Sequence, residues 1–315
     1  MHRRALLRLA CLSPALAFAR PVRAQPAQAA GLIDLMPAFW SAYDGAAGSS
    51  VRAEALRKAF FTPHGEVFGA AGLKTDAERI ARWLPQFDLI AAQVRRLDGG
   101  FMQAYGEHTA HFRAQFPDFE RDHAPIYLMP SLFSFDGHLQ PWAGRMPLFI
   151  GLDGIVRYHG ATPDLSVFLD HESFHLYHAQ VAPQIVMDDK APLFVSLWVE
   201  GLATYVSERL NPGASPLHVL LDDERLLAAD GATRLALAQG LRAALDSTAE
   251  QDATRFFSAG HAGPEPARGG YLIGLEAARR IGHDQPLAEL ARMPRAHVRA
   301  RLASTLDEMI AAKDA

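Results

Sequence analysis

Two histidines and a glutamate in one short run of this chain have the types and the spacing of a metal site. His171 and His175 are four residues apart, so on a helix both imidazoles lie on one face and can reach the same ion. Glu172 projects beside that face, where a carboxylate can act as general base toward a metal-bound water. The pattern, HExxH, is typical of catalytic zinc. Composition alone would produce it roughly 0.03 times in a chain of this length, so its surroundings have to support it.

The surroundings predict the helices that such a site needs. Residues 163–170 begin with Pro-Asp, which is typical of a helix N-terminus, and continue with apolar residues at helical spacing. Residues 193–205 are a second apolar helical stretch with one acidic residue, Glu200, in the middle. A carboxylate there is costly unless it is paired or binds a metal. Because a catalytic zinc takes three protein ligands, we predict Glu200 as the third ligand of one zinc ion per chain.

These motifs resemble a known group of enzymes. HExxH followed, 25 residues after its second histidine, by Glu-Gly-Leu-Ala-x-Tyr resembles the gluzincins, which are thermolysin-like zinc metallopeptidases. Residues 198–205 are similar to the glutamate helix of glycyl aminopeptidases and of predicted bacterial zinc-dependent proteases. The resemblance covers roughly residues 146–210 and 269–281. It implies His171, His175 and Glu200 as zinc ligands and Glu172 as catalytic base.

The chain departs from the gluzincin pattern in two places. Thermolysin has an aspartate one turn after the ligand glutamate, where this chain has Thr204, whose hydroxyl can accept the same imidazole N–H less strongly. Asp170, beside a ligand, is a second candidate for holding an imidazole, although an exposed helical aspartate is the alternative. His178 is expected at the surface, with a supporting position behind the metal ligands as the alternative. The GxMEN strand of gluzincin aminopeptidases is absent, so aminopeptidase specificity is not predicted. By resemblance, the substrate-binding edge strand is formed by Phe149, Ile150, Gly151, Leu152 and Asp153.

A donor that stabilises the oxyanion of hydrolysis is also expected. Gluzincins commonly supply a Tyr or His from the C-terminal lobe. Tyr271, in Gly-Gly-Tyr-Leu-Ile-Gly, resembles the glycine-flanked tyrosine of related peptidases, and small neighbours would let it approach a substrate. A tight start of a packed helix is the other interpretation of this run. His261 and His159 are the rival donors.

The first 24 residues resemble an export signal. They have a basic start, an apolar middle and a Val-Arg-Ala end typical of a cleavage site. Arg3 and Arg4, followed by two apolar residues and Arg8, resemble a twin-arginine signal, and an ordinary secretory signal is the alternative. We therefore expect a periplasmic or secreted protein. The one cysteine, Cys11, lies in this segment, so the mature chain would build its zinc site from nitrogen and oxygen.

Composition limits the partners of the chain. The formal net charge of −4 argues against a nucleic-acid binder. No run of 18 apolar residues occurs, which argues against a membrane span. With 49% apolar and 21% charged residues, the chain has the composition of a soluble globular protein. The expected partner is a peptide or protein substrate, and the chain is expected to be a monomer.

The expected fold is α+β and mainly helical. A zincin-like catalytic domain would carry a small mixed sheet above the HExxH helix, with helical regions on either side. We predict a signal peptide over residues 1–24, an N-terminal helical region over 25–122, and the zincin-like domain with a helical C-terminal part over 123–315. Helices are expected over 53–61, 76–98, 101–116, 217–229, 233–247, 271–281 and 297–311, and strands over 126–129, 132–135, 147–152 and 155–158.

The predicted function is zinc-dependent hydrolysis of peptide bonds, with Glu172 as general base. One alternative is a zinc-containing periplasmic binding or assembly factor without turnover, because a fold and a site do not fix a function. Such a factor has no need of the base at Glu172. The other alternative is a metal-dependent amidase that acts on a non-peptide substrate, because the same site chemistry would serve it.

Overall fold

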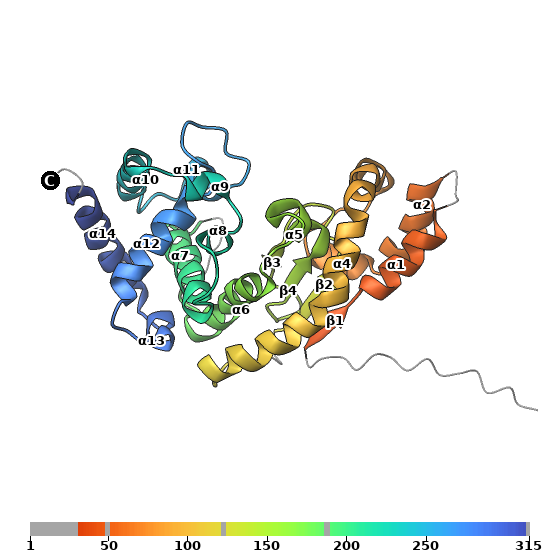
Figure 1. The fold of residues 1–315 in the computed structure, drawn as a ribbon, viewed down its shortest axis with the longest axis horizontal. Helices are drawn as coiled ribbons and strands as arrows, with labels where there is room; N and C mark the ends of the chain where they lie inside the picture. Colours follow the sequence, from red (N-terminus) through yellow and green to blue (C-terminus); the bar gives the residue numbers. More distant parts are fainter. Residues whose placement is uncertain (1–30, 48–50, 121–123, 186–189, 313–315) are drawn as a thin grey trace, which may run out of the picture.

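The computed structural model describes residues 31–47, 51–120, 124–185 and 190–312. Over these ranges the chain is mainly helical and has one small mixed sheet, in keeping with the expected α+β class (Figure 1). The predicted signal peptide, residues 1–24, lies outside the described residues. No helix in the described ranges combines the length and the apolar character needed to cross a membrane.

The sheet joins the two predicted halves of the chain. β1 (Leu32–Asp34), from the N-terminal half, runs parallel to β2 (Ile126–Met129), and β2 runs parallel to β4 (Leu148–Gly151), with Ile126 opposite Leu148. β3 (Gly137–Leu139) is antiparallel to β4 and has no second strand neighbour in the described sheet, so it forms an edge. The strands therefore lie in the order β1, β2, β4 and β3.

Strand order overturns the predicted substrate edge. Phe149, Ile150 and Gly151 lie in β4, which is covered by a strand on each side. Leu152 and Asp153 lie in the helix α5 (Leu152–His159), so the predicted strand over 155–158 is wrong as well. A short apolar run does not reveal whether it forms a strand or a helix, and strand order depends on partners far away in the sequence.

A buried carboxylate explains why the predicted strand over 132–135 is a turn. Leu132 and Phe133 have φ values of 55° and 58°, in the left-handed region. Asp153 accepts hydrogen bonds from the backbone N–H of Ser131 at 2.5 Å and of Phe133 at 2.9 Å, and from Trp83 Nε1 at 3.0 Å. The turn therefore wraps around a side chain at the start of α5, which no local sequence pattern shows.

The N-terminal half is built on one long helix, α4 (Ala77–Gln115). Asp76 caps it by accepting from the backbone N–H of Arg79 at 2.9 Å. The predicted break at Gly99 and Gly100 is wrong, since the helix passes through both residues. Each glycine costs about 1 kcal/mol in a helix, and the buried aromatic residues of α4 on either side outweigh that cost. The shorter elements before it are α1 (Met36–Gly45), α2 (Arg52–Leu56), the π-helix η1 (Arg57–Phe61) and α3 (Gly65–Ala70).

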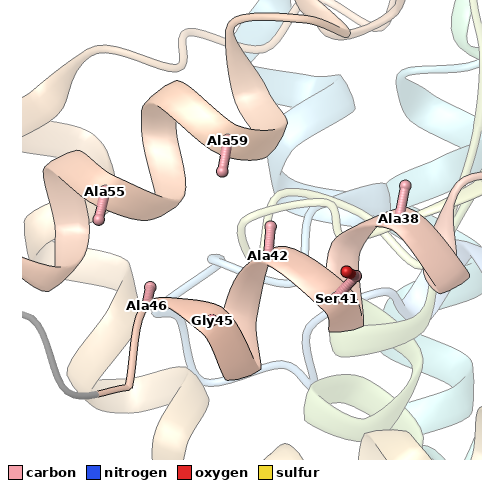
Figure 2. A pocket seen from close by; sticks show the side chains of 7 residues that line it. All are labelled: Ala38, Ser41, Ala42, Gly45, Ala46, Ala55 and Ala59. Atoms are coloured by element: carbon pink, nitrogen blue, oxygen red, sulfur yellow. The ribbon is translucent and has the colours of Figure 1, made fainter.

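Small side chains line a hollow between α1 and the α2–η1 segment (Figure 2). Their lack of bulk leaves this groove between the helices. The residues around it are Ala38, Ser41, Ala42, Gly45, Ala46, Ala55 and Ala59.

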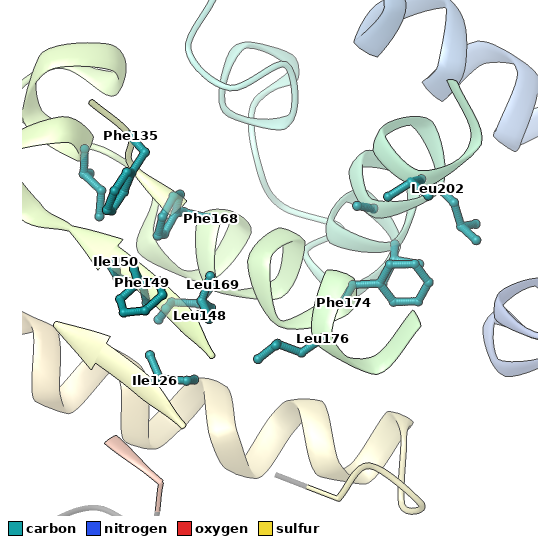
Figure 3. Close-up of a cluster of buried hydrophobic side chains, with 14 of the residues drawn as sticks. Ile126, Phe135, Leu148, Phe149, Ile150, Phe168, Leu169, Phe174, Leu176 and Leu202 are labelled. Atoms are coloured by element: carbon teal, nitrogen blue, oxygen red, sulfur yellow. The ribbon is translucent and has the colours of Figure 1, made fainter. Parts of the chain in front are cut away.

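The HExxH run lies in α6 (Leu165–Val181), between the sheet and the C-terminal helices (Figure 1). Phe168 and Leu169 of α6 belong to one cluster of buried apolar side chains with Leu148 and Ile150 of β4 (Figure 3). Asp164 caps the helix by accepting from the backbone N–H groups of residues 166 and 167. Burial of apolar side chains therefore fixes α6 against the sheet and fixes which face its histidines present.

Beyond α6 lie two closely packed helices, α7 (Leu193–Leu210) and α12 (Gly269–Gly282). They meet at Gly201 and Gly274, where a Cβ on either glycine would overlap backbone of the other helix. α7 is buried almost all round, which explains its apolar sequence on every face.

The remaining helices surround α7 and α12. The predicted helices over 233–247, 271–281 and 297–311 are found with shifted ends, whereas 217–229 divides into two short helices. The division lies at Leu221 and Asp222, whose φ values are 57° and 58°. The helices are α8 (Pro216–Val219), α9 (Glu224–Leu227), α10 (Gly231–Ala243), α11 (Glu250–Phe257), α13 (Leu287–Ala291) and α14 (Arg295–Ala311).

Candidate metal centre

The structure brings His171, His175 and Glu200 together. The Nε2 atoms of the two histidines are 3.1 Å apart, and Glu200 Oε2 lies 3.4 Å from each of them. Two ligand atoms bound about 2.0–2.1 Å from a tetrahedral zinc ion lie about 3.3–3.4 Å apart. The two distances to Glu200 match such an edge and the distance between the imidazoles is slightly shorter, so the three atoms could serve as three ligands of one tetrahedral metal ion.

Burial and charge at these side chains fit a cation. Glu200 is 7% exposed, and its Oε2 atom has no hydrogen-bond partner among the described residues although it is buried. Burial would raise the pKa of Glu200, but the neighbouring imidazoles lower it well below its usual range. Burial lowers the pKa of His171, whereas the charge of Glu200 outweighs burial and raises the pKa of His175. A divalent cation would satisfy the same carboxylate without a proton on either imidazole.

A second carboxylate, Glu172, lies slightly farther from the imidazoles. One of its oxygen atoms is within 4.8 Å of a nitrogen of each histidine, so it too could be considered a ligand. Glu200 is closer to both Nε2 atoms and fits direct coordination better. Glu172 is 8% exposed, and burial, assisted by the charges of Asp136 and Glu200, raises its pKa to about 8. Its carboxyl group therefore lies beside the three candidate ligands, at the place where a general base could act on a water bound to a cation.

Tyr271 lies beside the cluster at the start of α12. Its ring is nearly parallel to that of His171, with an interplanar angle of 22° and 6.3 Å between the centroids. Burial, together with the charge of Glu200, raises the pKa of the Tyr271 hydroxyl well above its ordinary value. The hydroxyl therefore keeps its proton and can donate it in a hydrogen bond.

The two rival donors are placed differently. Both ring nitrogens of His159 are occupied by carboxylates, those of Asp136 at 2.8 Å and Asp222 at 3.0 Å. His261 lies in the loop between α11 and α12, with its ring packed over Gly263. Of the three candidates, Tyr271 is the one whose ring stacks on a histidine of the cluster.

Thr204 and Asp170, the two residues predicted to orient the ligand imidazoles, make hydrogen bonds to other groups. The Thr204 hydroxyl donates to the backbone carbonyl of Glu200 at 2.8 Å. Asp170 is buried rather than exposed and does not hold His171. The Nδ1 atoms of His171 and His175 are buried without a hydrogen-bond partner among the described residues. The role expected for Thr204 and Asp170 is therefore not observed.

Asp170 instead binds a residue that the sequence does not single out. His108 of α4 donates from Nδ1 to Asp170 at 2.9 Å, and its Nε2 lies 2.8 Å from the hydroxyl of Ser173. Asn211, just after α7, donates to the other oxygen of Asp170 at 2.7 Å. The order Ser–His–Asp is that of a hydrolase triad, but Ser173 is 1% exposed and out of reach of a substrate. The network ties α4 and the end of α7 to the HExxH helix.

His178 is buried, whereas its sequence position had suggested a surface residue. It is 2% exposed and its ring stacks on Phe174 with an interplanar angle of 17°. Burial lowers the pKa of His178 to about 3, so the imidazole is neutral and serves as part of the packing of α6.

Comparisons of the chain with family models, with curated proteins and with solved structures found no match. The residues of the site and their geometry are therefore what indicates a function.

Proposed function

We propose that the chain is a gluzincin-type zinc metallopeptidase with a zincin-like catalytic domain, in which His171, His175 and Glu200 hold one zinc ion. The observation that carries this proposal is the convergence of three ligand atoms at 3.1 and 3.4 Å from side chains that are buried or nearly so. The donor set of two imidazoles and one carboxylate is one that catalytic zinc uses in other hydrolases.

The remaining side chains supply the chemistry of hydrolysis. A bound zinc ion would polarise a water molecule and the scissile carbonyl. Glu172, one position from a ligand histidine and within 4.8 Å of both imidazoles, would take the proton of the attacking water and pass it to the leaving amine. The Tyr271 hydroxyl would donate a hydrogen bond to the developing oxyanion.

The free edge of the sheet provides a place for the substrate backbone. β3 is paired on one side only, and Gly137 at its start lies against the carboxyl group of Glu172. A peptide added to β3 by strand pairing would pass directly beside the proposed base. This assigns to β3 the role that the sequence had assigned to residues 149–153.

The decisive experiment combines metal analysis with a peptide library. The purified chain should contain one zinc per monomer and cleave peptides, and a chelator should stop cleavage. Glu172→Gln is the matched variant, because it keeps the size of the side chain while removing the base. We expect it to retain zinc and to lose hydrolysis.

Other outcomes would point to other functions. Zinc at full occupancy without cleavage of any peptide would favour a binding or assembly factor. Cleavage of non-peptide amides alone would favour an amidase. Activity retained in Glu172→Gln would remove this residue from the mechanism.

We further propose that the chain is exported to the periplasm or secreted, by the twin-arginine route, and acts there as a monomer on a peptide or protein substrate. The support is the Arg3-Arg4 run and the cleavage-like end of the first 24 residues. N-terminal sequencing of the chain recovered outside the cytoplasm should begin near residue 25, and replacing both arginines by lysine should retain the precursor inside.

A further inference from the structure

Four titratable side chains form a continuous hydrogen-bonded row beside the proposed zinc centre. His159 at the end of α5 has Nε2 2.8 Å from Asp136 Oδ2 and Nδ1 3.0 Å from Asp222 Oδ2. The other oxygen of Asp222 lies 2.6 Å from His218 Nδ1. The side chain of His159 is 2% exposed and that of His218 is 31% exposed, so the row runs from the interior to the surface.

The two hydrogen bonds of His159 determine its charge. A carboxylate only accepts hydrogen bonds, so both nitrogens of His159 must donate, which requires the imidazolium form. Burial would lower the pKa of His159, but Asp136 and Asp222 raise it to about 9. Burial would raise the pKa of Asp136, and the bond to His159 lowers it instead. At neutral pH His159 is thus a cation held between two anions.

The two chain segments that supply Asp136 and Asp222 to His159 contain residues with an unfavourable backbone conformation. Leu132 and Phe133, just before Asp136, and Leu221 and Asp222 all have φ values between 55° and 58°. Residues with side chains rarely adopt this region, and such strain persists only where surrounding contacts impose it. Two strained segments from distant parts of the chain therefore position the two carboxylates that hydrogen-bond to His159.

Asp136 connects this bridge to the proposed base. Its Oδ1 atom accepts from the backbone N–H of Gly137 at 2.8 Å, and its carbonyl accepts from the N–H of Gly151 at 2.8 Å. A Cβ on Gly137 would overlap the carboxyl group of Glu172, so the two residues are in direct contact. The position of Asp136 sets that of Gly137, and Gly137 limits where the Glu172 carboxylate can lie.

We propose that His159 is a positioning residue for hydrolysis: by bridging Asp136 and Asp222 it fixes the start of the edge strand β3 against Glu172. The inference rests on the proposed function of the site. His159 touches neither substrate nor metal in this arrangement and acts through Asp136 and Gly137. The same bridge sets where a peptide paired with β3 would lie relative to the base.

Two variants and one control test the bridge. His159→Gln removes the cation, and Asp222→Asn weakens its outer support, while His218→Gln changes only the exposed end of the row. We expect both bridge variants to lower kcat by about 10- to 100-fold, the range found when groups supporting a metal centre are removed. Zinc affinity, measured by competition with a chelating dye, should change less than about 2-fold, and His218→Gln should keep both kcat and zinc affinity.

A readout that needs no activity separates positioning from general loss of structure. In the zinc-free chain labelled with ¹⁵N, both ring nitrogens of His159 should carry protons at pH 7.5. The NMR chemical shift of the Gly137 amide should change in His159→Gln and in Asp222→Asn and should stay the same in His218→Gln.

The pH profile gives a further check. His159 faces Asp136 before β3, Asp222 and, through it, His218 from the α8–α9 link, and the Phe168 ring of α6. Loss of the Asp222 charge should move the alkaline limb of kcat to lower pH, toward the ordinary titration range of histidine.

The outcomes distinguish this inference from the proposed function. An active wild-type enzyme whose kcat is unchanged in His159→Gln would overturn the positioning role and leave the peptidase proposal intact. Parallel loss of zinc and activity in the bridge variants would overturn it as well, because the bridge would then support the fold at large. A zinc-loaded wild-type chain that cleaves nothing would overturn both proposals.

Discussion

Gly137 and Glu172 lie in direct contact across the boundary between the sheet and the HExxH helix. A Cβ placed on Gly137 would meet all three atoms of the Glu172 carboxyl group. Those atoms are the far end of a flexible side chain, so an added methyl group could be accommodated by moving Glu172. The contact therefore matters more for the position of the base than for the stability of the fold.

This contact predicts that Gly137→Ala will fold, bind zinc and hydrolyse poorly. Displacing a catalytic group by about 1 Å can lower the rate by roughly 100-fold, and we expect a fall in kcat of that order. Steady-state kinetics, metal analysis and thermal unfolding of the same preparation would measure the three properties together.

Two other glycines serve as controls. Gly99→Ala, in α4, adds a methyl group with nothing within 4 Å, and should raise stability by roughly 0.5–1 kcal/mol without changing the rate. Gly154→Ala would drive a methyl group into the backbone of Phe135 and should unfold the chain. Full activity in Gly137→Ala would show that Glu172 does not work from this position.

Removing Glu200 should weaken metal binding. Glu200→Ala takes away the carboxylate whose Oε2 lies 3.4 Å from both imidazoles, leaving two ligands. We expect the zinc dissociation constant to rise by more than about 100-fold, beyond the effect of removing an outer supporting group. Glu208→Ala is the control on the same helix, since its carboxylate pairs with Arg279. Equal zinc affinity in the two variants would disqualify Glu200 as a ligand.

The parts of the site that the sequence could predict are those that depend on local spacing. His171 and His175 share a helical face because they are four residues apart. Glu200 was recognisable because a single carboxylate in an apolar helix needs a partner. Neither inference needs the fold, because helical periodicity places the two histidines and the cost of burying an unpaired carboxylate singles out Glu200.

The parts that the sequence could not predict depend on contacts between distant segments. Whether a strand is central or at the edge is decided by its neighbours, which is why β3 was missed as the edge. His108 contacts Asp170 across 62 positions of sequence, and His159 contacts Asp222 across 63. No spacing rule connects such pairs, because each is set by the packing of whole helices.

The buried network around Asp170 predicts an effect of His108 on stability. His108→Ala would remove the hydrogen bond to Asp170 at 2.9 Å inside the protein, and leaving a buried polar group without its partner costs about 1–3 kcal/mol. Chemical denaturation would measure the free energy of unfolding. His111→Ala, three residues later on the exposed face of α4, should change it by less than about 0.5 kcal/mol. Similar unfolding of the two variants would show that the network is not important for the fold.

The His159 bridge predicts that stability falls as the solution becomes alkaline. The pKa of His159 is raised from 6.5 to about 9 by its two carboxylates, so its proton is bound more tightly in the folded chain. The resulting stabilisation is complete below pH 6.5 and is lost as pH rises through about 9. At 1.36 kcal/mol per pKa unit it amounts to about 3 kcal/mol.

Denaturation of wild type and of His159→Gln between pH 6 and 10 should therefore give curves that converge at high pH. His283→Gln, at an exposed position, should run parallel to wild type. Curves for His159→Gln and wild type that stay parallel across this range would mean that His159 is not a cation in the folded protein.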